Sequence, residues 1–303
     1  MSNPWKDYLQ NFRDNLPTSV AYREDIARYV FNDKRFILPN DVVRYKNYLE
    51  KLGFVAFTPA TLFASGEQGA WYDPSDLSTM FTDTDGTTPA TVGDPVARIN
   101  DKSGRGNHAT QATAAARPTL QQTAGGLYYL EFDGVDDFLA LPLAVSGGAT
   151  ELDAFQAIST SDVTKTVFCP AYAVTSSIFA YLGGFFNSDV FIRVGLGNLS
   201  AGTLTTPVTN NTTYVVSALI DATAPSLAGR VNGAEIGSVT NLGGGGELSP
   251  TTQLFYGARN SSGTADTFGP LKSYGLILRQ ATSTTTEISG TEAYLADKSG
   301  VTP

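Results

Sequence analysis

Residues 127–141 read LYYLEFDGVDDFLAL, and this stretch contains the pattern that decides the fold. Two runs rich in aromatic and aliphatic side chains, 127–132 and 138–143, stand on either side of DGVDD. Such runs favour strands, whereas Asp and Gly favour turns because Asp side chains accept hydrogen bonds from the nearby backbone. The stretch therefore predicts two β-strands joined by a turn.

The same texture continues along the chain from Thr58. Short apolar or alternating runs are separated by Gly, Asn, Asp, Ser and Thr, which is typical of the strands and turns of a β-sandwich. Asn232-Gly233, between two such runs, favours a type I′ hairpin turn. The further predicted strands are 166–174, 176–186, 189–196, 213–221, 227–232, 234–239, 252–258 and 271–279.

A helix is predicted after the last of these strands. Thr284 and Glu287 have the spacing of a capping box, in which each side chain satisfies a free backbone N–H at the helix start. Ile288 and Leu295 then share one helix face, and Gly300 follows as a left-handed C-cap. The sequence therefore predicts a short C-terminal helix.

The start of the chain differs from the rest in both charge and periodicity. Residues 1–53 carry nine Lys and Arg against seven Asp and Glu, a net charge of +2, which leaves eleven against twenty-two, a net charge of −11, for the remainder. Helical periodicity is present near 4–16, 19–32 and 40–51. We therefore predict a small helical domain at 1–57 and a β-sandwich at 58–303.

Large aromatic side chains are concentrated in the predicted helical domain. Rings give an interface much contact area at low entropic cost, so a subset could dock onto a larger assembly. The alternative is that all of them pack within the small domain or onto the sandwich. The docking candidates are Trp5, Tyr8, Phe12, Tyr29, Tyr45 and Tyr48.

Composition excludes several classes of partner. The net charge of −9 disfavours nucleic acid and anionic lipid surfaces, and no apolar run approaches the roughly 20 residues that a membrane span needs. The single cysteine, Cys169, cannot form an intrachain disulfide, and the first residues lack the pattern of a signal peptide. We expect synthesis and folding in a cytoplasm.

Three further segments carry a family resemblance. Residues 71–81 (WYDPSDLSTMF), 101–118 (DKSGRGNHATQATAAARP) and 127–141 resemble, in order and spacing, the concanavalin A-like (laminin-G-like, LamG) jelly-roll domains of bacteriophage tail and appendage proteins. TYVVSALIDA at 213–222 and the stretch 274–301 look like later strands and the terminal helix of that family. The resemblance covers nearly all of 58–303, whereas 1–53 match no family.

The resemblance implies a non-enzymatic structural protein of the phage virion. It would be a compact tail fibre or tip, an adaptor, or a head-surface (capsid decoration) appendage, made in the host bacterial cytoplasm and held on the virion surface by the N-terminal helices. Other virion proteins would be its partners, and it would be a homo-oligomer in the particle. The alternative is a lectin-like host-recognition module, an adhesin that binds host surface polysaccharide.

The residues predict no catalytic site. Glucanases with this architecture place carboxylates at alternating strand positions, and Glu131 and Asp133 fit the first two positions of such a pattern, but Val135 stands at the third. His108, the only histidine, lies in a segment that the resemblance implies to be structural, and Cys169 lies in an apolar strand. One His and one Cys are also too few for a transition-metal site.

Two binding hypotheses remain open at this stage. No cofactor is expected, but Asp83 and Asp85 offer hard oxygen ligands in a loop, so calcium is kept as the alternative to an ordinary turn. A sugar-binding face needs an exposed ring beside convergent polar groups. The loops near Asn187, Asn210-Asn211 and Asn260 supply polar groups, although Asn is also a common turn residue.

Overall fold

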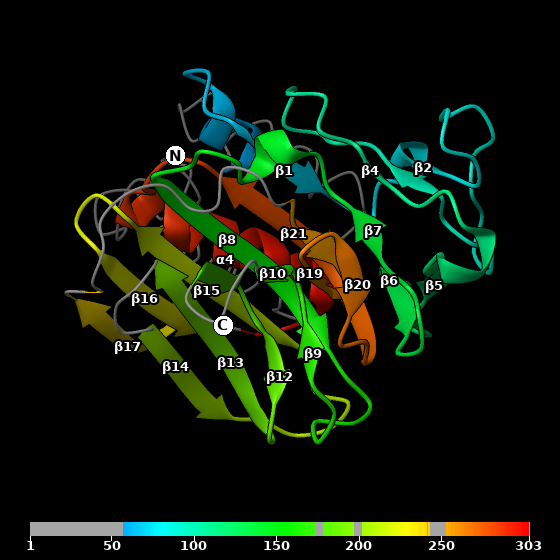
Figure 1. Cartoon of the computed structure of the whole chain (residues 1–303). Helices are drawn as coiled ribbons and strands as arrows, with labels where there is room; N and C mark the ends of the chain where they lie inside the picture. Colours follow the sequence, from blue (N-terminus) through cyan, green and yellow to red (C-terminus); the bar gives the residue numbers. More distant parts are fainter. Residues whose placement is uncertain (1–56, 174–177, 197–201, 241, 243–252, 303) are drawn as a thin grey trace, which may run out of the picture.

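The protein folds as a β-sandwich with a third, smaller sheet beside it (Figure 1). The computed structural model describes residues 57–302 apart from 174–177, 197–201, 241 and 243–252. The mainly β fold with a C-terminal helix, predicted from the sequence, is confirmed. The predicted N-terminal helices and the docking candidates Trp5, Tyr8, Phe12, Tyr29, Tyr45 and Tyr48 lie outside the described residues and stay predictions.

Sheet I is an eight-stranded antiparallel sheet in the middle of the molecule. Its strand order is β17-β16-β15-β8-β21-β6-β5, and β1 pairs with β21. The bounds are β1 Gly69–Tyr72, β5 Thr119–Gln122, β6 Tyr128–Asp133, β8 Glu151–Ser159, β15 Tyr214–Asp221, β16 Ser226–Val231, β17 Ala234–Thr240 and β21 Pro270–Arg279.

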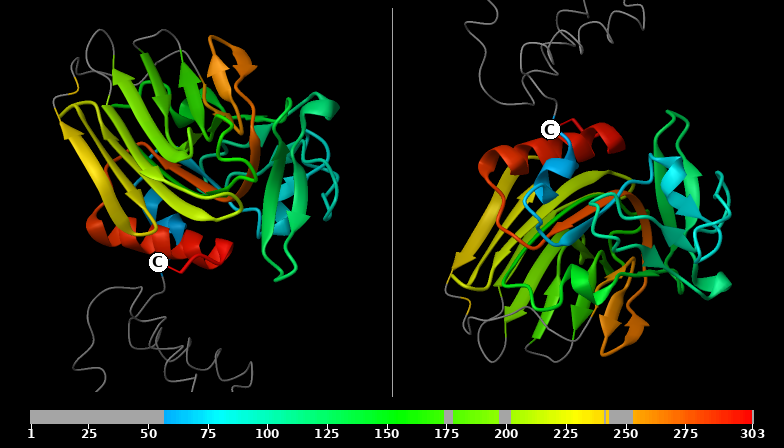
Figure 2. Two further views of the ribbon diagram at one scale, coloured as in Figure 1. Left: turned by 90° about the horizontal axis from the view of Figure 1, so that it is seen from below. Right: turned by 90° about the horizontal axis from the view of Figure 1, so that it is seen from above.

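Sheet II packs on one face of sheet I (Figure 2). Its order is β20-β19-β10-β11-β13-β12-β9, with β14 paired to β13, and β10 and β19 form its parallel pair. The bounds are β9 Val167–Phe168, β10 Ala171–Ala173, β11 Ile178–Tyr181, β12 Gly184–Phe186, β13 Asp189–Leu196, β14 Gly202–Pro207, β19 Arg259–Ser261 and β20 Thr264–Asp266.

Sheet III is a five-stranded sheet at one side of the sandwich, with the order β18-β7-β4-β3-β2 (Figure 1). Its strands are β2 Met80–Phe81, β3 Arg98–Ile99, β4 Ala109–Thr110, β7 Leu139–Ala140 and β18 Phe255–Tyr256. The described helices are η1 Pro59–Phe63, η2 Leu77–Thr79, η3 Ala114–Ala116, η4 Leu143–Val145 and α4 Thr285–Ser299. None of these helices has the length and apolar character to cross a membrane.

The central strands of sheet I, β8 and β21, are buried on both faces because α4 and η1 cover the face opposite sheet II (Figure 2). Along β8, Leu152 and Ile158 belong to the core between the sheets, whereas Phe155 belongs to a second core under α4. All three side chains are fully buried, and each such side chain contributes about 1.5–3 kcal/mol to stability. The central strand therefore carries buried apolar side chains on both of its faces, with Asp153 and Gln156 as buried polar exceptions.

Helix α4 begins at the capping box predicted from the sequence. Thr284 accepts a hydrogen bond from the backbone N–H of Glu287, the Glu287 side chain accepts one from the backbone of Thr284, and Gly300 ends the helix at φ 72°. The buried Glu292 carboxylate fixes the helix on sheet I. It accepts hydrogen bonds of 2.8 Å from Ser217 Oγ on β15 and 2.8 Å from Arg230 Nε on β16.

The segment 101–108 ties β1 into the sandwich. The Asp101 carboxylate accepts hydrogen bonds from the backbone N–H of Trp71 at 2.9 Å and of Asn107 at 3.0 Å. Asn107 Nδ2 donates to the Gly69 carbonyl at 2.7 Å, and the Tyr72 hydroxyl donates to the Asn107 carbonyl. Parts of WYDPSD and DKSGRGNH, which carry the family resemblance, therefore form one buried network with a structural role.

Lys102 connects the same network to α4. Its Nζ lies 2.8 Å from Asp73 and 2.9 Å from Asp76, and 4.5 Å above the ring of Trp71. The Tyr294 hydroxyl on α4 donates to Asp73 at 2.7 Å. The Lys102 ammonium holds the pKa of Asp76 below its usual value. The Lys102 ammonium therefore has its partners within the fold.

The contact between Phe57, at the described start of the chain, and helix α4 leads to a specific prediction. A Cβ atom on Gly290, in the middle of α4, would lie 2.6 Å from the Phe57 ring. Gly→Ala inside a helix ordinarily stabilises by up to about 1 kcal/mol. For Gly290→Ala we expect a loss of about 1–3 kcal/mol instead, because the helix and the ring must move apart. Denaturant unfolding measures the change.

Thr286→Ala, at an exposed position of the same helix, is the matched control and should be neutral or slightly stabilising. Combining Gly290→Ala with Phe57→Ala should cost less than the sum of the two single changes, because the clash is gone. Stabilisation by Gly290→Ala alone would contradict the packing of Phe57 on α4.

Candidate functional site

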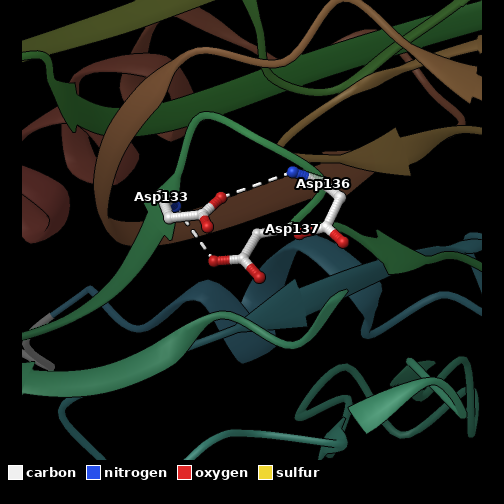
Figure 3. Close-up of side chains that lie close together, drawn as sticks. All are labelled: Asp133, Asp136 and Asp137. Carbon is white, nitrogen blue, oxygen red and sulfur yellow. Dashed lines mark hydrogen bonds between the residues drawn. The ribbon is translucent and has the colours of Figure 1, made fainter. Parts of the chain in front are cut away.

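The turn between β6 and β7, residues 133–137, gathers three carboxylates and is called the acidic turn below (Figure 3). Oxygens of Asp133, Asp136 and Asp137 all lie within 4.8 Å of one another. Asp133 accepts from the Val135 N–H at 2.7 Å, and Asp137 accepts from the Asp133 N–H at 2.9 Å. The turn predicted from DGVDD is therefore confirmed, with Asp side chains bound to their own backbone.

Asp136 differs from the other two carboxylates. Its side chain makes no hydrogen bond or ion pair within the described part of the chain. Whereas Asp137 is buried, Asp136 is half-buried. Next to it, Val135 is 71% exposed, the largest exposure among the large apolar side chains that the structure describes. Burial, with Asp133 and Asp136 close by, raises the pKa of Asp137 to about 6. The turn thus presents one free carboxylate and one exposed apolar group.

Three aromatic rings pack together where the chain leaves the acidic turn. Phe138 lies 4.7 Å from Phe255 and 6.5 Å from Phe268, measured between ring centroids. Phe138 and Phe268 are half-buried, so part of each ring is open to solvent. At Gly134, φ is 80° and a Cβ atom would lie 2.5 Å from the Pro270 nitrogen. Close packing against the start of β21 therefore fixes the turn relative to the rings.

This combination suits a ligand with both hydroxyl groups and apolar faces. A free carboxylate accepts hydrogen bonds from hydroxyls, and rings and Val135 contact C–H groups. Three convergent carboxylates also have the hard oxygen donors that calcium prefers. Sequence reasoning predicted the turn but not the site, because the lack of a partner for Asp136 and the approach of Phe268 depend on the tertiary structure.

Asp83 and Asp85, the candidate calcium ligands from the sequence, belong to a different loop. Both Asp83 oxygens accept hydrogen bonds, from the Thr87 N–H at 3.0 Å and the Thr88 N–H at 2.6 Å. These bonds, with the Thr87 backbone contribution largest, hold the pKa of Asp83 well below its usual value. Arg98 donates to the Asp85 carbonyl at 3.2 Å. Among the described residues no third acid joins them, so the turn interpretation fits this geometry.

The asparagines considered for a sugar-binding face have structural roles in turns and in hydrogen bonds with the backbone. Asn210 Oδ1 accepts from the Val163 N–H at 2.7 Å, and Asn260 bonds to Gln253 and Gly263. Asn187 and Asn211 occupy left-handed turn positions, at φ 51° and 58°. Asn210 and Asn260 are thus committed to the fold, and the loops alone do not form a site.

The groups that were considered for catalysis also have roles in the fold. His108 Nδ1 accepts from the Asp101 N–H at 3.1 Å, and burial lowers the pKa of the imidazole. Cys169 is fully buried, and burial raises the pKa of its thiol far above the usual value. A thiol in this state is a poor nucleophile. Glu131 and Asp133 lie on β6 with Val135 beyond them, as the sequence indicated.

Comparisons with known proteins support the fold. No family model matches the sequence, and no curated protein matches it either. One similar solved structure is of botulinum neurotoxin type C, whose entry into cells depends on two ganglioside molecules; the identity is 9%, the TM-score 0.50, and the match covers 76% of this chain and 51% of that one. This chain therefore spans about half the length of that structure.

Two further solved structures resemble the chain. Domain 4 of AbnA, an extracellular arabinanase from Geobacillus stearothermophilus in complex with arabinotriose, has 14% identity and a TM-score of 0.47, with 75% of this chain and 98% of that one covered. The binding domain of Paraclostridial Mosquitocidal Protein 1 has 9% identity and a TM-score of 0.48, with 74% and 53% covered. The neurotoxin match, with its TM-score of 0.50 and 9% identity, shows the β-sandwich fold and nothing finer.

The occupied oxygens of Asp83 lead to a prediction about calcium. We expect calcium to bind neither Asp83 nor Asp85, so any difference between the thermal midpoints with calcium and with excess chelator should be the same in the wild type and in Asp83→Ala/Asp85→Ala. A ligand at a hundredfold excess over its Kd would stabilise the native state by about 2.7 kcal/mol. For a chain of this size that gain shifts the midpoint by roughly 2–4 °C. A shift abolished by Asp83→Ala/Asp85→Ala would contradict the prediction, and one abolished by Asp136→Asn would place the ion at the acidic turn.

Proposed function

We propose that this chain is a non-enzymatic carbohydrate-binding module and that the acidic turn is its binding site. The observation that carries the proposal is the Asp136 carboxylate, which has no partner among the described residues (Figure 3). The exposed Val135 precedes it in the turn, and the half-buried rings of Phe138 and Phe268 lie where the chain leaves the turn. Sugars present hydroxyl donors on their edges and C–H groups on their faces, so both parts of the site have a counterpart. The ganglioside dependence of the neurotoxin with a similar fold supports this ligand class.

The absence of hydrolysis is part of the proposal. A glycosidase needs a second carboxylate on the other side of the scissile bond, about 5–9.5 Å from the first. The three acids of the turn lie within 4.8 Å of one another on one turn, and two of them bind the backbone. His108 and Cys169 are committed to the fold. These groups suit binding better than bond cleavage.

For its biological setting we propose a bacteriophage virion. The support is the resemblance of 71–81, 101–118 and 127–141 to laminin-G-like domains of phage appendages, together with the change in net charge from +2 to −11 near residue 53. Residues 1–57 would dock onto the head or tail, as a homo-oligomer with other virion proteins as partners. The sandwich would then display the acidic turn toward host surface polysaccharide. A purely structural appendage is the rival role.

The first prediction of this proposal concerns Asp136. The purified chain should retain a subset of glycans on an array, and Asp136→Asn should weaken that binding about tenfold or more, because a hydrogen bond to a charged group contributes about 1.5–3 kcal/mol. Asp83→Asn, in the loop already closed by hydrogen bonds, is the matched control and should bind normally. Retained glycans should keep their chain length. Equal binding by Asp136→Asn, or shortened products, would refute this assignment.

The second prediction concerns particle attachment. Deleting 1–56, which keeps Phe57 on α4, should leave a folded sandwich that no longer joins particles in an assembly reaction. Substituting Trp5, Tyr8 and Phe12 with Ala in the full chain should give the same loss of incorporation. Thermal unfolding of the truncated chain checks that the sandwich is intact. Normal incorporation of the truncated chain would overturn the docking role.

A further inference from the structure

Sheet II carries the one exposed aromatic ring among the side chains that the structure describes, Phe186, which is 39% exposed. Its ring packs on Phe191 with 5.2 Å between centroids. Val190, Ile192 and Val194 of β13 face the main core and are fully buried. Since side chains alternate along a strand, Phe191 lies on the outer face, and Phe186 stands on top of it.

The surroundings of this ring follow from strand register. Phe186 on β12 pairs with Asp189 on β13, and Asp189 pairs with Pro207 on β14. The next outward row pairs Phe191 with exposed Thr205. The row after that pairs Arg193 with exposed Thr203. The exposed ring of Phe186 therefore shares its row with Asp189 and Pro207, and the exposed hydroxyl of Thr205 lies in the next row of the same face.

The ring is held on a fixed hairpin. Asn187 and Ser188, the two turn residues between β12 and β13, have φ of 51° and 68°. The Ser188 N–H donates to the Val163 carbonyl at 3.0 Å, and the Ser188 carbonyl accepts from the Val208 N–H at 3.0 Å. Both neighbouring loops thus hold the hairpin tip. A ring fixed in this way loses little conformational entropy on binding.

We propose that this face, centred on Phe186, is a second carbohydrate contact, which stacks the ring against the C–H face of a neutral pyranose. The inference rests on the proposed function but concerns a different surface from the acidic turn. An apolar protein surface would bury Thr203, Thr205 and Asp189 without partners, which is costly, whereas sugar hydroxyls supply partners. The Asp189 carboxylate on this face and the net charge of −11 over 54–303 both disfavour polyanions.

The test uses the full chain on an array of neutral, amino and acidic oligosaccharides. Wild type should bind neutral glycans. Phe186→Ala should weaken that binding about tenfold, the effect of removing an aromatic anchor, and Phe186→Tyr should retain it. Leu143→Ala, at a side chain that is 41% exposed elsewhere, is the matched control and should bind normally. Equal thermal midpoints for all variants show that folding is intact.

The outcomes separate the two proposals. Binding that falls in Phe186→Ala and returns in Phe186→Tyr supports the second contact, whatever Asp136→Asn does. Unchanged binding by Phe186→Ala, with a loss in Asp136→Asn, overturns the second contact and leaves the acidic turn in place. Preference of wild type for acidic oligosaccharides overturns the neutral ligand class. No binding to any oligosaccharide refutes both proposals.

Discussion

Burial of the central strands of sheet I, β8 and β21, on both faces is the constraint on which the rest of the structure depends. Without α4, the helix-facing side chains of β8, such as Phe155, would lie in water. The helix brings Glu292 under cover, which is costly for a charge without a partner, and Arg230 and Ser217 supply its partners. Asp153, on the same face of β8, is also covered, and burial raises the pKa of its carboxyl to about 7 although Ser283 donates to it at 2.7 Å.

The acidic composition of the sandwich is largely explained by its turns. Five Asp-x-Ser/Thr sequences repeat one arrangement, in which the carboxylate accepts from both the N–H and the hydroxyl two residues later. They begin at Asp73, Asp76, Asp101, Asp162 and Asp221. These local hydrogen bonds help to fix the loops, and Asp73, Asp76 and Asp101 also accept from residues that are distant in the sequence. Arg98, Arg105 and Arg117 act over longer distances by donating to loop carbonyls.

Sequence patterns predicted the elements that rest on local rules. The strand 189–196, the hairpin turn at Asn232-Gly233, with φ of 48° and 79°, and the capped helix α4 are all present. The central strand β8 was missed. Its sequence, ELDAFQAIS, shows no alternation because both faces are buried, and Ala, Asp and Glu have low strand propensity. The acidic turn was predicted only as a turn, since Phe138, Phe255 and Phe268 meet through tertiary packing.

Most charged side chains of the described turns have a structural role, and the few groups without one therefore stand out. Most aspartates of the described turns bind their own backbone, so a carboxylate without a partner, as at Asp136, does not help to close its turn. The exposed part of the Phe186 ring likewise contributes no hydrophobic free energy to folding, because only buried apolar area does so. Both groups stand at or beside tight turns held by short strands, where backbone pairing fixes their position before any ligand arrives. Groups that are fixed in advance and unused by the fold meet the physical requirement for binding with little loss of entropy.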